Sequence, residues 1–229
     1  MFNLDGYLPS VLGGALITLE VSLVSLVLAV ALGILAALGK LSHNRLAKSV
    51  ATSYTTLIRS VPDLVLMLLI YFGGQVLVNE LAYAAGYEDY IEISPFMAGV
   101  CTIGFIFGAY LAETFRGAIL AVPPGQLEAG RAYGMSGFQV FRRILFPQMM
   151  RHALPGFGNN WLVLMKTTAL VSIIGLDDMV RKASLAAGAT QKPFTFYLLV
   201  AAVFLAFTTI STLLLQWAER RYSPELKRS

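Results

Sequence analysis

Long stretches without a charged residue are the feature that most constrains how this chain can fold. Uncharged stretches of 19, 16, 20 and 26 residues cover 21–39, 64–79, 93–112 and 193–218, and two shorter ones flank Lys166. A helix that crosses about 30 Å of hydrocarbon needs about 20 mostly apolar residues, and it satisfies its own backbone hydrogen bonds. The sequence therefore predicts an all-α polytopic membrane protein with five transmembrane helices, at about 12–38, 55–79, 96–120, 154–176 and 194–217.

The composition excludes several other classes of protein. Of the 229 residues, 57% are hydrophobic and only 13% are charged, whereas a soluble domain has about 25% charged residues. A soluble enzyme, a disordered chain and a disulfide-framed secreted module are all excluded. The single cysteine, Cys101, permits no internal disulfide and no cysteine-based zinc site, and we expect it to be buried. The first apolar stretch is too long for a cleaved signal peptide, so one membrane domain is expected over 1–229.

The distribution of lysine and arginine predicts the orientation. Eleven of the 17 basic residues fall in 39–53, 121–153 and 218–229, whereas three fall in 177–193 on the other side. By the positive-inside rule, the N-terminus is then outside and the C-terminus is in the cytoplasm. The net charge of +4 reflects cytoplasmic loops beside anionic lipid rather than a nucleic-acid surface.

The longest cytoplasmic loop, about 121–150, has an unusual pattern. Two prolines end the third predicted helix, a short helix follows around 128–133, and Gly134 breaks it. A second stretch, 138–146, has apolar residues at helical spacing and arginines on the opposite side, and Pro147 is expected to stop it. These are either two helices lying against lipid headgroups or a helix-turn-helix that projects into the cytoplasm as a docking element for a soluble partner.

This loop resembles the EAA loop of ABC importer permeases. That signature is Glu-Ala-Ala, three residues, Gly, nine residues, then Ile, one residue and Leu-Pro. The positions that match its spacing, with Gly130 and Phe146 as departures from Ala and Leu, are Glu128, Ala129, Gly130, Gly134, Ile144, Phe146 and Pro147. The resemblance covers nearly the whole chain.

Four other segments, two of which overlap, are similar to permeases for polar amino acids. The segment 54–62 is similar to the Arg-x-x-Pro entry to their second helix, and 107–117 is similar to the end of their third helix. The segments 61–64 and 219–223 resemble the Q-type subunit of importers for histidine, lysine, arginine and ornithine.

The resemblance implies a type I importer permease with several partners. These are a second, homologous permease subunit, two ATP-binding cassette subunits and a periplasmic solute-binding protein, in the bacterial inner membrane. The chain has no Gly-x-x-x-x-Gly-Lys-Ser/Thr loop, because Leu41 follows Gly39-Lys40. We therefore expect no enzyme activity, cofactor or metal here, with ATP and Mg²⁺ bound by the partner ATPases. The resemblance also implies that the EAA loop transmits their closure as a rigid-body movement.

Charges within the predicted spans are costly and are usually paired or functional. Glu113 and Arg116 are expected to form an ion pair at i, i+3, and Arg59 and Asp63 to pair at i, i+4 across Pro62. Lys166 is isolated in the fourth span. It is either the counter-ion of an acidic neighbour or a gate residue.

Other polar residues are candidates for the substrate path. Asn159 and Asn160 either line that path or hydrogen-bond between helices. Asp177 and Asp178 either cap a following segment or meet a cationic substrate, and Glu20 is also acidic at outer membrane depth. A partly buried carboxylate would compensate the desolvation of a cation, so we expect Asp177→Asn to lower arginine uptake about ten- to hundredfold.

Two function classes remain open at this point. The first is a subunit of an ATP-driven importer for a polar, basic amino acid: arginine, ornithine, lysine or histidine. The alternative is a stand-alone secondary transporter or channel subunit for small polar solutes. That class is built from repeats or broken helices around a midplane site, and it needs no docking loop. Five helices do not divide into two equal halves, which favours the importer subunit.

Overall fold

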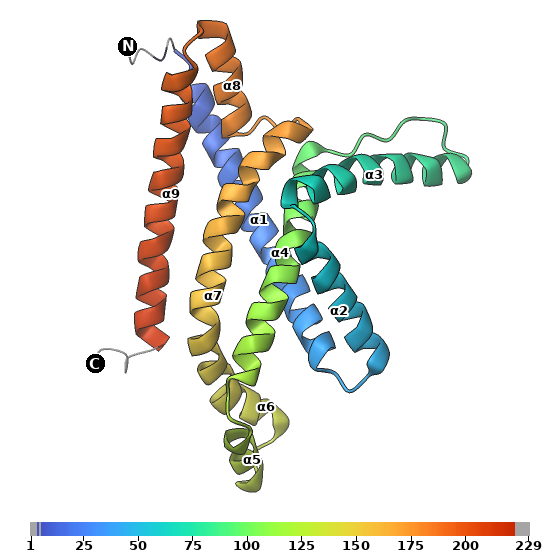
Figure 1. Ribbon diagram of the computed structural model, residues 1–229, viewed down its shortest axis with the longest axis vertical. Coiled ribbons are helices and arrows are strands. Elements are labelled where there is room, and N and C mark those ends of the chain that lie inside the picture. The colour runs from blue at the N-terminus through green and yellow to red at the C-terminus, as the bar shows by residue number, and fades with distance from the viewer. Residues whose placement is uncertain (1–3, 5, 223–229) are drawn as a thin grey trace.

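The structure is a computed structural model that describes residues 4 and 6–222, and the described part is helical with no strand. Asp5, Ser223, Lys227 and Arg228, which contributed to the charge count or to the resemblance, lie outside the described residues. The elements shown in Figure 1 are α1 (Leu8–Leu41), α2 (Arg45–Ser60), α3 (Asp63–Ala84), α4 (Pro95–Leu120), α5 (Pro124–Ala132), α6 (Gly137–Val140), the π-helix η1 (Phe141–Leu145), α7 (Phe146–Thr167), the 3₁₀-helix η2 (Thr168–Ile174), α8 (Met179–Thr190) and α9 (Pro193–Tyr222).

Four of the described helices, α1, α3, α4 and α9, are long and apolar enough to cross a membrane. The fourth predicted span, 154–176, is present as α7 followed by η2, but it is not among these four. The hydropathy of α7 is lowered by five polar or charged residues: Arg151, His152, Asn159, Asn160 and Lys166. The all-helical membrane fold is therefore confirmed, and α7 is a helix whose position depends on its neighbours more than on its own hydrophobicity.

Helix α4 is the most buried of the four spans, with 67% of its apolar window buried, against 6% for α9. Small residues let α1 approach it closely. A Cβ added at Gly104 would lie 2.6 Å from Leu28 Cδ2, and one at Gly108 would lie 2.8 Å from Leu32 Cβ. This Gly-x-x-x-Gly spacing is typical of helix interfaces in membranes, where close backbone approach supplies the packing energy.

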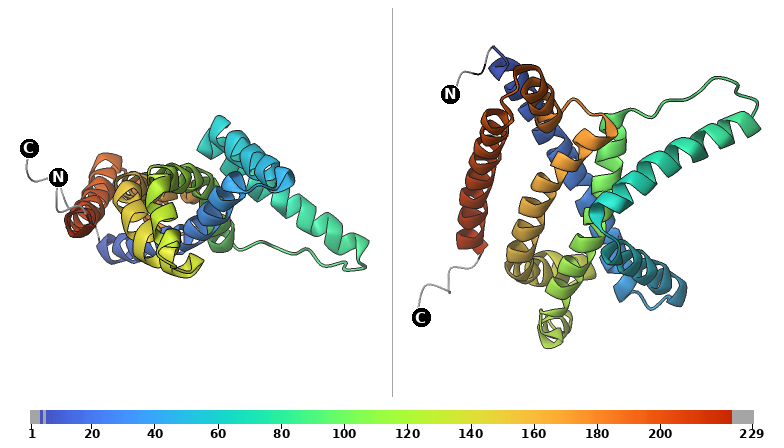
Figure 2. Two further views of the ribbon diagram at one scale, coloured as in Figure 1. Left: turned by 90° about the horizontal axis from the view of Figure 1, so that it is seen from below. Right: turned by 45° about the horizontal axis from the view of Figure 1, so that its top comes forward.

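The prediction of one continuous helix over 55–79 is wrong. Helix α2 ends at Ser60, and α3 begins at Asp63 after Pro62. Val61 is extended, with φ −111° and ψ 140°, because the ring of the following proline disfavours the helical conformation there. Helix α2 packs beside α1 and α4, whereas α3 leaves the bundle at a steep angle (Figures 1 and 2).

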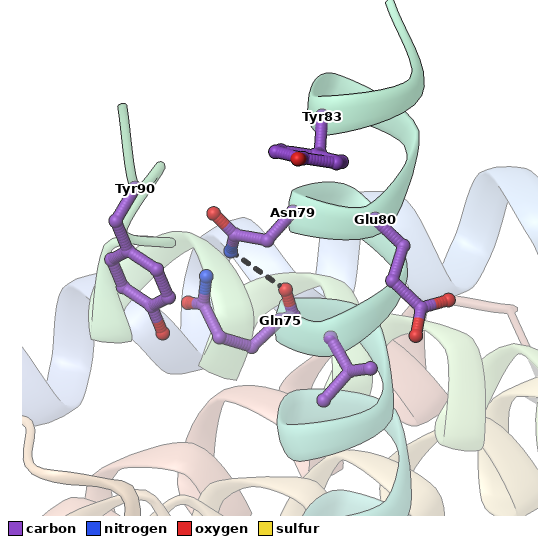
Figure 3. A pocket seen from close by; sticks show the side chains of 6 residues that line it. Gln75, Asn79, Glu80, Tyr83 and Tyr90 are labelled. Atoms are coloured by element: carbon purple, nitrogen blue, oxygen red, sulfur yellow. Dashed lines mark hydrogen bonds between the residues drawn. The ribbon is translucent and has the colours of Figure 1, made fainter. Parts of the chain in front are cut away.

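Two amide side chains tie α3 to the segment that returns to α4. The backbone N–H groups of Ile91 and Ile93 donate to Asn79 Oδ1 (2.8 Å) and Gln75 Oε1 (2.9 Å), and both amide nitrogens donate to the carbonyl of Ile91. Figure 3 shows these side chains at a surface pocket of about 400 Å³, with Asn79 also bonded to the Gln75 carbonyl. The returning segment has no regular structure of its own, so these bonds replace the backbone partners that it lacks.

Cys101 is exposed in this chain, so the prediction that it is buried is wrong. It lies on the side of α4 that faces α3, beside Tyr71 and Thr102 at a pocket of about 230 Å³. Because α4 is apolar on all sides, its sequence gives no sign of which side packs against α1.

Candidate coupling loop and translocation path

Local hydrogen bonds determine where the EAA-like loop turns. Helix α5 ends in a Schellman motif, in which the N–H of Gly134 donates to the Arg131 carbonyl (2.9 Å) and the N–H of Met135 donates to the Gly130 carbonyl (3.1 Å). Gly134 has φ +77° and nothing within 4 Å of a Cβ added there. The backbone conformation, rather than lack of space, therefore requires glycine at this position.

The second helix of the loop starts at Gly137, three residues after Gly134. Ser136 caps α6 by a capping box: its hydroxyl accepts from the Gln139 N–H (3.3 Å), and Gln139 Oε1 accepts from the Ser136 N–H (2.8 Å). The Schellman motif constrains the backbone before Met135, and the capping box constrains it after Met135. Met135 is therefore the main residue of the turn whose backbone conformation neither motif sets. The angle between α5 and α6 is thus preorganised.

Pro147 does not stop the second helix, contrary to prediction. The chain widens into the π-helix η1, in which the N–H of Phe146 donates to the Phe141 carbonyl, and then continues as α7 with Pro147 in its first turn. A proline in an α-helix clashes with the carbonyl four residues earlier, and the wider π turn moves that carbonyl away. The second helix of the loop therefore runs through η1 into α7 without a break.

The departure from the family signature at Gly130 has a packing reason. A Cβ at Gly130 would lie 2.5 Å from Ile144 Cδ1 and 3.3 Å from Val140 Cγ2. Gly130 and Val140 are buried, whereas Glu128 and Ala129 are exposed. Ile144, one of the matched positions, thus packs α5 against η1, and the matched Glu128 and Ala129 face outward.

The outward side of this hairpin is exposed and partly aromatic. Tyr133 is 88% exposed and Phe138 is 70% exposed. Helix α5 projects past the ends of α4 and α7, at the bottom of Figure 1. Helices lying flat on lipid headgroups would not extend beyond the bundle in this way, so the geometry favours the docking element. We call residues 124–145 the coupling hairpin.

An ion-pair cluster lies on α4 near this end of the bundle. Arg116 Nε lies 3.0 Å from Glu113 Oε2, which confirms that predicted pair. The other carboxylate oxygen of Glu113 binds Lys40 Nζ, which also donates to Thr55 Oγ1 (2.9 Å). The cluster joins α1, α2 and α4. Sequence reasoning missed Lys40 because 73 residues separate it from Glu113, although its place at the end of an uncharged stretch was a signal.

Arg59 and Asp63 contact Tyr110 rather than each other. The guanidinium of Arg59 lies 5.6 Å from the centroid of the Tyr110 ring, and the Asp63 carboxylate accepts a hydrogen bond from the Tyr110 hydroxyl. The predicted i, i+4 pair needs a continuous helix, and the break at Pro62 removes it.

The structure separates the two aspartates at the outer end of α7. Asp177 is 68% exposed and pairs with Arg181 (3.0 Å). It is therefore not the partly buried carboxylate that the expected large effect on uptake required. Asp178 is buried and is the N-cap of α8, where it accepts from the Arg181 N–H (2.9 Å).

The buried aspartate lies against α1. A Cβ at Gly14 would lie 2.8 Å from the Asp178 carbonyl carbon, and Thr18 Oγ1 accepts from the Met179 N–H (3.2 Å). Asp178 Oδ2 is buried without a hydrogen-bond partner. Burial raises the pKa of this carboxyl to about 6 from its usual 3.8, although two backbone N–H groups act in the opposite direction.

This raised pKa predicts a pH dependence of stability. The folded protein binds the Asp178 proton more tightly than the unfolded chain, so the stabilisation is full below pH about 4 and is lost as the pH rises through about 6. Asp178→Asn keeps an N-cap but cannot ionise. Thermal unfolding in detergent measures this. Between pH 4 and pH 7, we expect the free energy of unfolding of the variant to rise relative to that of the wild type by on the order of 2–3 kcal/mol. Parallel pH curves would contradict this prediction, and Asp177→Asn is the matched control.

The remaining path candidates are dispersed. Asn160 Nδ2 donates to Thr114 Oγ1 (3.0 Å) and to the Gly156 carbonyl (2.8 Å), so it joins α7 to α4. Asn159 and Glu20 are exposed. Lys166 is also exposed, and among the described residues no acidic side chain pairs with it, so this part of the chain does not bear out the predicted counter-ion role. Just beyond it, α7 tightens into η2, and such a 3₁₀ stretch often marks a hinge.

Comparison with known proteins agrees with this geometry. HisQ, the histidine/lysine/arginine/ornithine transport system permease protein of Escherichia coli (strain K12), is 53% identical over 226 residues, which are 99% of both chains. OccQ, the octopine transport system permease protein of Rhizobium radiobacter, is 38% identical over 99% of this chain and 96% of its own. A chain in a crystal structure of an amino acid ABC transporter with histidines superposes with a TM-score of 0.79 and 35% identity, covering 94% of this chain and 95% of that one. The family described as binding-protein-dependent transport system inner membrane component matches residues 29–224. The chain therefore belongs to this family of inner-membrane transport components.

Proposed function

We propose that the chain is the membrane-spanning subunit of an ATP-driven importer that carries a basic amino acid into the cytoplasm. The observation that carries this proposal is the coupling hairpin, which is preorganised and exposes Tyr133 and Phe138 beyond the end of the bundle. The name of HisQ, a permease for histidine, lysine, arginine and ornithine, supports a basic amino acid as the substrate. A stand-alone transporter would have no use for such a hairpin.

The contacts of the chain suggest how movement passes from the hairpin to the bundle. A partner ATPase, which binds ATP and Mg²⁺, contacts α5. When the two ATPase subunits close on each other, α5 moves with them. The packing of Ile144 on Gly130 and the continuous path from η1 into α7 carry that movement upward. The cluster of Lys40, Glu113 and Arg116 makes α1, α2 and α4 move as one body, in a rigid-body transition.

The exposed apolar helices suggest where the second permease subunit binds. Only 11% of the apolar window of α3 is buried within this chain. Its exposed apolar side chains include Leu69 and Phe72. A projecting helix of this kind gains packing only from another protein surface, because lipid supplies no hydrophobic driving force. A homologous permease subunit would supply that surface, and a periplasmic binding protein would deliver the solute to the opposite end from the hairpin.

The orientation gives a labelling prediction. In a Cys101→Ala background, which is needed because Cys101 is exposed, a cysteine at Ser94 should react with a membrane-impermeant maleimide in intact cells. A cysteine at Ser136 should react only after permeabilisation. Both positions are exposed in this chain, so burial does not bias the comparison. The reverse labelling pattern would invert the proposed topology.

The function is tested by purifying the complex through a tag on this chain and reconstituting it with its binding protein. We expect ATPase subunits to copurify. We also expect ATP-dependent uptake of radiolabelled arginine to be inhibited by lysine, ornithine or histidine, and not by glutamine. Uptake without ATP, or a complex that contains no ATPase, would support the secondary transporter instead.

Neutralising the outer carboxylates tests whether they make the chain prefer a cationic substrate over a neutral one. An exposed ion pair such as Asp177–Arg181 is worth about 0–1 kcal/mol, so Asp177→Asn is expected to lower arginine uptake less than tenfold relative to a neutral competitor. Asp89→Asn, in the outer segment between α3 and α4, is the control. If Asp177→Asn, Asp178→Asn and Glu20→Gln all leave the uptake ratio unchanged, the selecting carboxylate is not in this chain.

A further inference from the structure

A wholly apolar cavity of about 440 Å³ lies between α1, α4 and the start of α7. Every residue that lines it is apolar, among them Ile34 and Leu38 of α1, Ile119 of α4, and Phe146 and Phe157 of α7. Water is a poor occupant, because a buried water needs two to four polar partners. The cavity therefore suits an apolar ligand.

The length of the cavity matches one leaflet of a bilayer. Its lining on α7 extends from Phe146 to Phe157, which is about 16 Å at the helical rise of 1.5 Å per residue. Half of the hydrocarbon thickness of a bilayer is about 15 Å. The ligand that fits is an extended hydrocarbon chain that enters from the end near the coupling hairpin.

The π-helix η1 and the first residue of α7 contribute two aromatic rings to that end, and η1 also carries two arginines. Phe141 and Phe146 both line the cavity, and their ring centroids are 5.8 Å apart. The i→i+5 spacing of a π-turn puts them on one side. Arg142 and Arg143 lie between them in the sequence and are exposed, and neither has an ion-pair partner within the described residues.

We propose that an anionic phospholipid from the leaflet on the hairpin side binds here, with one acyl chain in the cavity and its phosphate on Arg142 and Arg143. Charge complementarity selects this occupant, because two exposed guanidinium groups without an ion-pair partner follow the cavity-lining Phe141 directly in the sequence and attract an anionic headgroup, while the apolar lining accepts the chain. The lipid touches η1, the link between the hairpin and α7. It is therefore positioned to stiffen the path along which the hairpin moves the bundle.

Native mass spectrometry tests the site on the intact complex purified through a tag on this chain. The complex is exchanged into mixed micelles that contain phosphatidylglycerol or phosphatidylcholine, and the retained lipid is counted. We expect wild type to retain phosphatidylglycerol at least fivefold more than phosphatidylcholine. Equal retention of the two lipids would overturn the anionic headgroup.

Two pairs of variants separate the acyl site from the headgroup site. Ile34→Trp fills the cavity from its rim and is expected to lower phosphatidylglycerol retention at least fivefold, whereas Val27→Trp, on an exposed part of the same helix, should not. Arg142→Gln with Arg143→Gln should lower it about tenfold, and the matched pair Arg220→Gln with Arg221→Gln, at the end of α9, should not. Equal effects within either pair would overturn the proposal.

A measurement on the wild type needs no variant to assemble. Phosphatidylglycerol that carries a diazirine in its acyl chain is photolysed in the complex, and the crosslinks are mapped by peptide mass spectrometry. We expect crosslinks in 30–38 and 146–157. Crosslinks confined to other helices would overturn the site and would indicate that a side chain of the partner permease fills the cavity instead.

Discussion

Replacing Gly134 with valine is expected to leave the chain inserted and assembled while lowering transport at least tenfold and uncoupling it from ATP hydrolysis. Gly134 has φ +77° at the end of α5. In this conformation an L-residue costs about 1–2 kcal/mol, and a β-branched one costs more. Valine would break the Schellman motif and swing α5 away from η1. Uptake and ATPase activity are measured on the same reconstituted complex.

A graded series separates backbone conformation from bulk at this site. Asparagine tolerates a positive φ better than alanine, and alanine better than valine, so transport should fall in the order Gly, Asn, Ala, Val. Gly137→Ala is the matched control, because Gly137 has open space around it and no positive φ. Normal transport by Gly134→Val at wild-type abundance would contradict the role given to the hairpin.

Replacing Lys40 with methionine is expected to destabilise the subunit by about 3 kcal/mol, because it leaves part of the charge of Glu113 unpaired in a mostly buried place. The side chains of Lys40 and Glu113 are 14% and 20% exposed, and Lys40 also binds Thr55. The loss should appear as a lower midpoint of thermal aggregation of the detergent-solubilised complex. Reduced abundance in membranes should accompany it.

A double substitution identifies the cause of that loss. Lys40→Met combined with Glu113→Gln removes both charges, and it should recover part of the stability that Lys40→Met alone loses. Lys48→Met, at an exposed lysine on α2, should have little effect. A double variant whose loss equals the sum of the two single losses would mean that the ion pair does not join α1 to α4.

Local rules account for the parts of this protein that the sequence predicted well. The uncharged stretches predicted helices that coincide with α1, α4 and α9. Gly134 was expected to break the short helix of the loop, and it follows the end of α5 with a positive φ. Asp178 was one of two expected caps, and it is the N-cap of α8. Each of these features depends on groups within a few residues of one another.

Sequence reasoning failed in two situations. In one, the helix-breaking effect of proline competed with the helix favoured by hydropathy; in the other, a helix was apolar on every side, so its packed side could not be told from its sequence. Pro62 broke a helix that its hydropathy favoured, whereas Pro147 was accommodated by a π-turn. Either outcome is open to a proline, and the packing around it decides which one occurs. Cys101 was placed wrongly because apolar residues surround it on every side of α4.

The sequence by itself determined that this chain spans a membrane, where α1, α4 and α9 lie and that it carries an EAA-like loop, because hydrophobic length and turn chemistry are read from neighbouring residues. Only the tertiary structure decided that Lys40 meets Glu113, that Asp178 rather than Asp177 is buried, and that an apolar cavity lies between α1, α4 and the start of α7. Those contacts join residues far apart in the chain. They depend on which sides of the helices pack together, which the van der Waals fit of small residues such as Gly104 and Gly108 decides and hydropathy does not.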